Sequence, residues 1–133
     1  MTVLTLESAA RIAAAGRHAA AGIGTAMNIA VVDAGGHLLH FSRMDDAWLG
    51  SIDLALKKAK TSVLFRMPTS VLGAVSQPGG PAYGIEWSNG GLVSFGGGLP
   101  ITDAAGRVLG AIGVSGGTGD QDVQVAQAGL AAL

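Results

Sequence analysis

Three charged side chains have the types and spacing of an anion-binding or acid–base site. Arg43 and Asp45 lie where a predicted strand meets a predicted helix, and Lys58 follows on that helix. A guanidinium binds a carboxylate or phosphate through two parallel hydrogen bonds, and a neighbouring carboxylate can orient it or act as a base. The commoner alternative, a structural ion pair at a helix cap with a solvated lysine, stays open. We treat Arg43, Asp45 and Lys58 as candidate catalytic residues and Arg43 also as a candidate ligand-binding residue.

The three histidines, His18, His37 and His40, lack the helical spacing of a metal site. His37 and His40 are three positions apart along a predicted strand, so they point to opposite faces and cannot chelate one ion together. The chain has no cysteine, which excludes thiolate-ligated metals and disulfides. Imidazole suits haem iron, and His18 lies on the surface of a predicted helix with one side open, so it is our candidate axial haem ligand. A plain exposed histidine is the alternative.

Residues 113–117 match the G-x-S-x-G pattern of a nucleophile elbow around Ser115. With 22 glycines in 133 residues such a match arises easily by chance, and all three histidines precede Ser115. A serine hydrolase is therefore disfavoured. Glycine amides ahead of a helix can also bind a carboxylate or phosphate, which makes Gly116 and Gly117 candidate ligand-binding residues. The alternative is a crowded turn that only glycine fits.

The composition limits both the class of protein and its partners. The chain has eight basic and nine acidic residues and is 49% hydrophobic. It is long enough for one domain, over residues 1–133, and too apolar to be disordered. The near-zero net charge disfavours nucleic acid as a partner, and the longest uncharged stretch, 67–85, contains three prolines and cannot be a membrane helix. We expect a cytoplasmic protein. With so few charges to cover its surface, we also expect a homo-oligomer.

Periodicity and capping residues predict an alternation of helices and hairpins. Thr5 caps the first helix, Thr118 and Gln121 have capping-box spacing, and Trp48 begins the apolar stripe of the second helix, with the neighbouring lysines off it. The predicted helices are 5–22, 47–66 and one from about 119, and the predicted strands are 28–33, 37–43, 92–95, 99–102 and 107–115. The resulting order, α-β-β-α-β-β-β-α, indicates an α+β domain with a largely antiparallel sheet.

Residues 67–91 show no period and are rich in Gly, Pro, Ser and Asn, so they are predicted to form a long loop. Loops of this length in a small domain are more often functional than idle. Tyr83 and Trp87 in this loop have rings that can stack on a flat ligand, and both are candidate ligand-binding residues. Packing in the core or at an interface is the alternative.

Short motifs occur in register along essentially the whole chain. They are Ala30–Asp33, Gly35–His37, Arg43–Ala47, Lys58–Thr61, Gly97–Ile101, Gly110–Gly116 and Gln121-Asp122 with Val125-Ala126. Together they resemble the GlcG/HbpS family of small haem-binding, haem-degrading proteins and the C-terminal domain of PduO-type cobalamin adenosyltransferases. The resemblance implies a profilin-like, five-stranded antiparallel sheet with helices on both faces, a homo-oligomer that is often an octamer, and haem as cofactor. It also implies that the glycines of 110–117 have a mainly structural role.

We therefore expect a small oligomeric protein that binds haem or another small ligand. His18 is proposed as iron ligand from its position on the helix, not from a matching motif. The alternative is a cofactor-free lyase, isomerase or hydrolase that acts on a small anionic metabolite through Arg43, Asp45 and Lys58. A purely structural assembly module is a third possibility.

Overall fold

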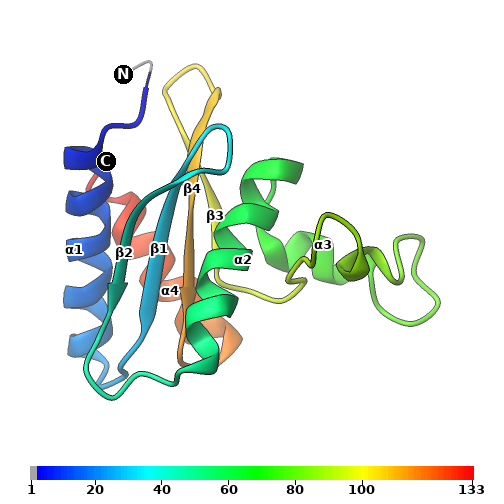
Figure 1. Ribbon diagram of the computed structural model, residues 1–133, viewed down its shortest axis with the longest axis horizontal. Helices are drawn as coiled ribbons and strands as arrows, with labels where there is room; N and C mark the ends of the chain where they lie inside the picture. The colour runs from blue at the N-terminus through cyan, green and yellow to red at the C-terminus, as the bar shows by residue number, and fades with distance from the viewer. Residues whose placement is uncertain (1–2) are drawn as a thin grey trace.

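The computed structural model describes residues 3–133 and has helices on both sides of one antiparallel sheet (Figure 1). The elements in chain order are α1 (Leu6–Gly22), β1 (Asn28–Asp33), β2 (Leu38–Arg43), α2 (Gly50–Phe65), α3 (Thr69–Val75), a 3₁₀ turn (Ile85–Trp87), β3 (Gly98–Thr102), β4 (Val108–Ser115) and α4 (Gly119–Leu130). The α+β class is therefore confirmed. Among the described residues no helix is both long and apolar enough to cross a membrane.

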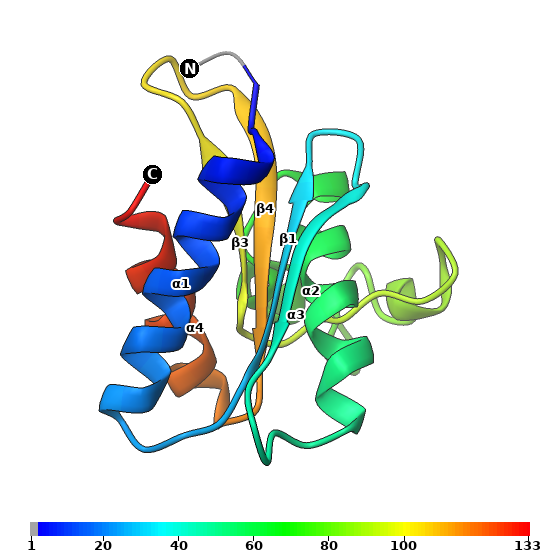
Figure 2. The ribbon, with the colours of Figure 1, turned by 60° about the vertical axis from the view of Figure 1, so that its left-hand side comes forward.

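The four strands lie in the order β2-β1-β4-β3, and every neighbouring pair is antiparallel. Asn28 lies opposite both Arg43 and Ser115 at one end of the sheet, while Asp33 lies opposite Gly110 at the other end. Helices α1 and α4 cover one face and α2 covers the other (Figure 2). The end of β2 and the end of α1 thus lie at the same end of the sheet, away from the β3–β4 turn.

The core has two halves, one on each face of the sheet, because alternate side chains of a strand point to opposite faces. The face under α1 and α4 carries large side chains, and the face under α2 carries small ones. The first group includes Ile12, Ile29, Val31, Ile112, Val114 and Val125. The second consists of Ala30, Val32, Ala55, Ala59, Val63 and Ala111.

The prediction of a fifth strand over 92–95 is wrong, and with it the predicted element order. Leu92 and Val93 are buried as expected, but the amide of Val93 donates to Thr61 Oγ1 at 3.0 Å and that of Leu92 to the carbonyl of Glu86 at 2.9 Å. These hydrogen bonds occupy backbone amides that would otherwise pair with a neighbouring strand. The segment therefore packs beside α2 and does not join the sheet. Pairing with β4 begins only near Gly97, whose carbonyl accepts from the Val114 amide.

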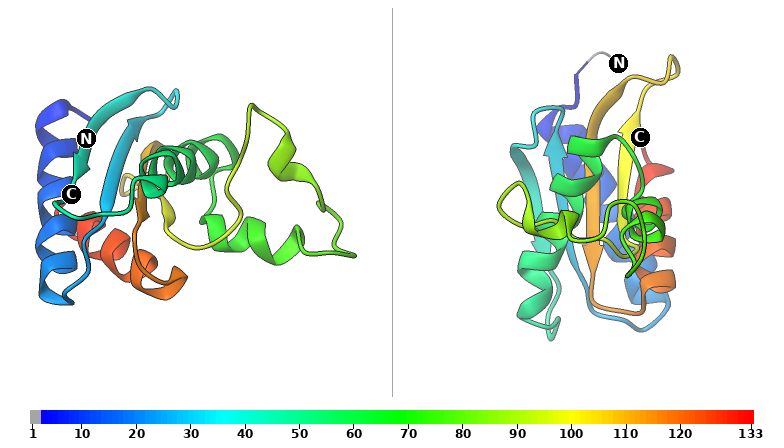
Figure 3. Two further views of the ribbon diagram at one scale, coloured as in Figure 1. Left: turned by 60° about the horizontal axis from the view of Figure 1, so that its bottom comes forward. Right: turned by 90° about the vertical axis from the view of Figure 1, so that its right-hand side faces the viewer.

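The prediction of an irregular loop over 67–91 is also wrong in part. Helix α3 forms immediately after Pro68, a residue that suits a helix start because it needs no amide partner there. Beyond α3 the chain projects away from the sheet on the side of α2, opposite α1 (Figure 3). A 3₁₀ turn at Ile85–Trp87 is the only further helical segment in that described projection.

The second helix starts later than predicted, at Gly50 rather than 47. Trp48, expected in its buried stripe, precedes the helix and is 69% exposed. The predicted caps are confirmed. The amide of Ser8 donates to Thr5 Oγ1 at 3.1 Å, and Thr118 with Gln121 forms a reciprocal capping box.

Helix α2 lies unusually close to the strands because glycine replaces side chains beneath it. A Cβ added to Gly113 in β4 would collide with the carbonyl oxygen of Ala55 and lie 2.5 Å from the backbone nitrogen of Ala59. A Cβ on Gly98 would lie 2.5 Å from the carbonyl oxygen of Lys58. In each case the obstacle is backbone, which cannot move aside as a flexible side chain can.

We expect Gly113→Ala to lower the free energy of unfolding by about 1–3 kcal/mol, because the methyl group must displace the backbone of α2. Denaturant unfolding at one fixed protein concentration measures this change. Gly50→Ala is the matched control, since nothing lies within 4 Å of a Cβ added there. It should change the free energy by no more than about 0.5 kcal/mol. Equal losses in the two variants would contradict the close approach.

Candidate functional site

A depression on the surface brings together three residues singled out in the sequence, His18, Arg43 and Asp45. It opens to solvent, has a volume of about 680 Å³ and lies between the second half of α1 and the end of β2. It is lined by Ala14, Arg17, His18, Ala21, Ser42, Arg43, Met44 and Asp45. We call it the His18 depression.

The helical repeat of α1 explains which of its residues line this depression. Ala14, Arg17, His18 and Ala21 occupy positions i, i+3, i+4 and i+7, which share one face of an α-helix. Ala14 and Ala21 stand about one turn before and after His18, and neither has a side chain beyond Cβ. They therefore leave room beside an exposed imidazole that is held on a regular helix.

The opposite wall lies on backbone that the sheet fixes. The amide of Met44, just after β2, donates to the carbonyl of Met27 at 3.1 Å. The buried Asn28 of β1 donates through Nδ2 to the carbonyl of Trp48 at 3.1 Å. The connection from β2 to α2 is thus tied to β1 at two points, and Arg43 and Asp45 lie on this restrained segment.

The His18 depression carries more positive than negative charge. Arg17 and Arg43 supply two guanidiniums against the single carboxylate of Asp45. Apolar surface comes from the two alanines and Met44. Within residues 3–133 no three His, Asp or Glu side chains are close enough to form a metal cage. The arrangement suits an anionic molecule with an apolar body and offers it one imidazole.

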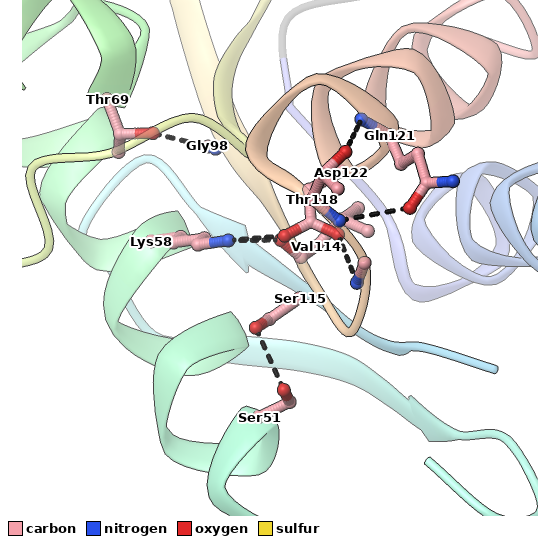
Figure 4. Close-up of polar contacts among 10 residues, drawn as sticks. Ser51, Lys58, Thr69, Gly98, Val114, Ser115, Thr118, Gln121 and Asp122 are labelled. Carbon is pink, nitrogen blue, oxygen red and sulfur yellow. Dashed lines mark hydrogen bonds and ion pairs between the residues drawn. The ribbon is translucent and has the colours of Figure 1, made fainter. Parts of the chain in front are cut away.

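Lys58 does not line this depression, and the expectation that it lies on a solvated face is wrong. Its side chain is fully buried, and Nζ donates to Asp122 Oδ2 and to the carbonyl oxygen of Val114, both at 2.8 Å (Figure 4). The ring centroid of Phe95 lies 5.1 Å from Nζ, within the range of a cation–π contact. The structure therefore does not bring Lys58 together with Arg43 and Asp45.

Burial lowers the pKa of Lys58 below its ordinary value, and the hydrogen bond and negative charge of Asp122 oppose that shift. Asp122 also accepts the amide of Gly117 through Oδ1 at 2.9 Å. Both carboxylate oxygens are therefore used, one by a helix on the far face of the sheet and one by the turn before α4. The pair joins these two layers.

The glycine turn after β4 packs against the core. A Cβ on Gly116 would lie 2.5 Å from the carbonyl oxygen of Ala26, and the Gly117 amide is already bound to Asp122. Ser115 is buried and donates to Ser51 Oγ at 3.0 Å (Figure 4). These contacts agree with the crowded-turn interpretation. Ligand binding by Gly116 and Gly117 stays a prediction.

Tyr83 and Trp87 lie far from His18. They are 67% and 93% exposed on the projection that follows α3, whereas α1 lies on the other face of the sheet (Figure 3). Arg17, in contrast, lines the His18 depression and was missed from the sequence. Its position three residues after Ala14 and next to His18 is the signal that could have identified it.

Comparison with known proteins gives one consistent family. A sequence model described as "Haem degrading protein HbpS-like" matches residues 4–131. A 15.0 kDa protein from the dhaT–dhaS intergenic region of Citrobacter freundii is 40% identical over 131 residues, which covers 98% of this chain and 92% of that protein.

Two further similarities involve PduO proteins. The corrinoid adenosyltransferase PduO of Citrobacter freundii is 42% identical over 106 residues, covering 79% of this chain but only 31% of PduO. A crystal structure of a PduOC:haem complex has a TM-score of 0.93 at 36% identity, covering 98% of this chain and 95% of that one.

We expect Lys58→Met to lower the free energy of unfolding by about 3–5 kcal/mol, because it leaves a buried carboxylate without its cation. The neighbouring Lys57→Met is the matched control. Lys57 Nζ lies 3.1 Å from Asp53 Oδ2 in a partly exposed pair, which contributes at most about 1 kcal/mol. Denaturant unfolding of both variants decides the matter, and a Lys58 variant as stable as the Lys57 variant would contradict a structural role for the buried pair.

Proposed function

The chain belongs to the HbpS-like family, and from this membership we propose that it is a small haem-binding protein with the His18 depression as its binding site. The observation that carries the proposal is the gathering of one imidazole, two guanidiniums and small apolar side chains in one open hollow. The family description and the haem complex of a similar structure support haem as the ligand.

The residues of the His18 depression fit the chemistry of haem. Haem iron takes imidazole nitrogen as an axial ligand, and His18 is the candidate for that position. The two propionates of haem are carboxylates, which guanidiniums bind through parallel hydrogen bonds, so Arg17 and Arg43 are the candidate partners. Ala14, Ala21 and Met44 provide apolar surface beside them.

Bound haem would supply iron for ligand binding or oxidation, and the chain itself supplies position and charge. His18 stays in place because α1 is packed on the sheet through residues such as Ile12 and Ala20. Arg43 stays in place because β2 is paired along its length with β1. The hollow is open on one side, so one face of a flat ligand would remain uncovered in a single chain.

A cofactor-free enzyme acting on a small anion, the alternative drawn from the sequence, has less support. Its three candidate residues are not gathered, because Lys58 is buried in an ion pair while Arg43 and Asp45 line the surface. Without Lys58, an enzyme of that kind would have Arg43 to bind the anion and Asp45 or His18 as general acid or base.

We further propose that the protein acts as a homo-oligomer, with an octamer as the expected size. Several large apolar side chains are exposed in the described chain, and two tryptophans are among them. Exposed apolar patches mark sites of association between proteins. Trp48 and Leu49 are 69% and 71% exposed beside the His18 depression, and Trp87 is 93% exposed on the projection after α3. A cytoplasmic location stays a prediction from the sequence.

Haemin titrated into the purified protein should give a saturable shift of the Soret band near one haem per chain. We expect His18→Ala to weaken binding by about tenfold or more, since loss of even an outer partner of a metal ligand costs that much.

His37→Ala is the matched control, because His37 is also exposed but lies beside Asp33 at the other end of the sheet. It should bind haemin like the wild type. Absence of a saturable shift in the wild-type protein would overturn the haem proposal. If both substitutions weakened haemin binding equally, His18 would not be the iron ligand.

Light scattering during size-exclusion chromatography should give a mass that is a multiple of the 13.1 kDa chain. Trp87→Ser should lower that mass or make it concentration-dependent, because it removes apolar area that we expect to be buried between copies. Ala104→Ser, at an exposed position in the β3–β4 turn, should leave the mass unchanged. A single chain mass at every concentration would contradict the homo-oligomer.

A further inference from the structure

A second depression lies on the other face of the sheet and at its other end from the His18 depression. It has a volume of about 700 Å³ and lies between the C-terminal end of α2 and the β3–β4 turn. Its lining includes Val63, Arg66, Pro100, Thr102, Arg107 and Val108. We call it the Arg66–Arg107 depression. It shares no residue with the His18 depression.

The guanidinium of Arg107, on a side chain that is 67% exposed, is bonded to the turn that it belongs to. Asp103 Oδ2 accepts from Arg107 Nε at 2.9 Å, and Oδ1 of the same carboxylate accepts the amides of Ala105 and Arg107 at 2.9 Å each. The backbone hydrogen bond from Arg107, followed by the bond and charge of its side chain, holds the pKa of Asp103 below its ordinary value. The carboxylate of Asp103 therefore stays charged. Both terminal nitrogens of Arg107 remain available to another acceptor.

Arg66 occupies a position where glycine would be the usual residue. It follows the last residue of α2 with φ 56° and ψ 43°, a left-handed backbone conformation that strains any side chain with a Cβ. Among residues 3–133 no carboxylate lies within ion-pair distance of its guanidinium. An unpaired arginine kept in a strained conformation at the edge of a hollow points to a role in that hollow.

The residues that line the Arg66–Arg107 depression form a polar side and an apolar side. Arg66, Arg107 and the hydroxyl of Thr102 provide hydrogen-bond donors, whereas Val63, Pro100 and Val108 provide hydrocarbon. With Asp103 already engaged by Arg107, the two guanidiniums leave one net positive charge. That pairing of donors with hydrocarbon matches a small organic anion better than a bare inorganic one.

We propose that the Arg66–Arg107 depression is a second ligand site, which binds small organic anions carrying a phosphate or carboxylate group on an apolar body. The anionic group lies between the two guanidiniums, each of which can donate two parallel hydrogen bonds to it. The apolar body lies against Pro100 and Val108. This site does not depend on haem or on His18.

Calorimetric titration of the protein with phenyl phosphate, benzoate and inorganic phosphate tests the proposal. We expect saturable binding of at least one aromatic anion, with inorganic phosphate weaker because it lacks the apolar body. The stronger of phenyl phosphate and benzoate tells which anionic group the site prefers. Arg66→Gln and Arg107→Gln should each weaken that binding by about tenfold or more.

Two further variants separate recognition of the anion from structural roles of Arg66. Arg66→Lys keeps the positive charge near the end of α2 but loses the fork, and it should bind the probe more weakly. Arg66→Gly removes the backbone strain, so it should raise the thermal midpoint and still lose the probe. Arg11→Gln, at an exposed position of α1 outside both depressions, is the control and should bind like the wild type.

Absence of saturable binding of all three probes at millimolar concentration would overturn the proposal. Binding that survives in the Arg66→Gln, Arg107→Gln double variant, or that falls equally in Arg11→Gln, would also overturn it. Haemin binding by the double variant should be unchanged, so failure of this site and failure of the haem site are distinguishable.

Discussion

The fold depends on one contact across the sheet, the ion pair between Lys58 and Asp122. Lys58 belongs to α2 on one face and Asp122 to α4 on the other, yet their charged atoms lie 2.8 Å apart. The lysine reaches the carboxylate by passing Gly97, where an added Cβ would lie 2.8 Å from Nζ and close to the carbonyl of Val114. A side chain at position 97 would block this path. The Lys58–Asp122 pair, Gly97 and the close approach of α2 to the strands therefore depend on one another.

The close approach of α2 fills the space beneath that helix, and both candidate depressions lie on the surface. The α2 face of the sheet is lined by alanine and glycine so that the helix backbone itself fills the space. Both depressions lie instead where an element ends. One is at the end of β2 beside α1, and the other is at the end of α2 beside the β3–β4 turn. Their arginines lie on restrained backbone outside the core, whereas Val63 belongs both to the Arg66–Arg107 depression and to the core.

The sequence correctly predicted the features that depend only on neighbouring residues. The caps at Thr5 and Thr118 and the turns of the two hairpins depend on neighbours within a few residues, and the structure has them as expected. Burial of Lys58 depends on a partner 64 positions further along the chain, so no window of sequence contains it. The segment 92–95 has the pattern of a strand, but Thr61 of α2 takes its amide.

The candidate site was predicted in the same uneven way. His18, Arg43 and Asp45 were chosen for their chemistry, and the antiparallel pairing of β2 with β1 beside α1 is what brings them together. Lys58 was chosen on the same grounds and proved to be interior. Residue type alone does not distinguish a surface lysine from a buried one when its charge partner is distant in the sequence.

The projection between α2 and β3 has a consequence for the order of folding. Its two ends meet where the amide of Gly98 donates to Thr69 Oγ1 at 2.9 Å, and the amide of Val93 within it also donates to Thr61 Oγ1 of α2. Strand β3 finds β4 across the short turn at Asp103–Gly106, whereas the loop must bring together ends that are far apart in the chain. Local contacts form faster than distant ones, so we expect the β3–β4 hairpin to exist before this loop closes onto α2. The projection would then be the last part of the chain to become ordered and the first to open.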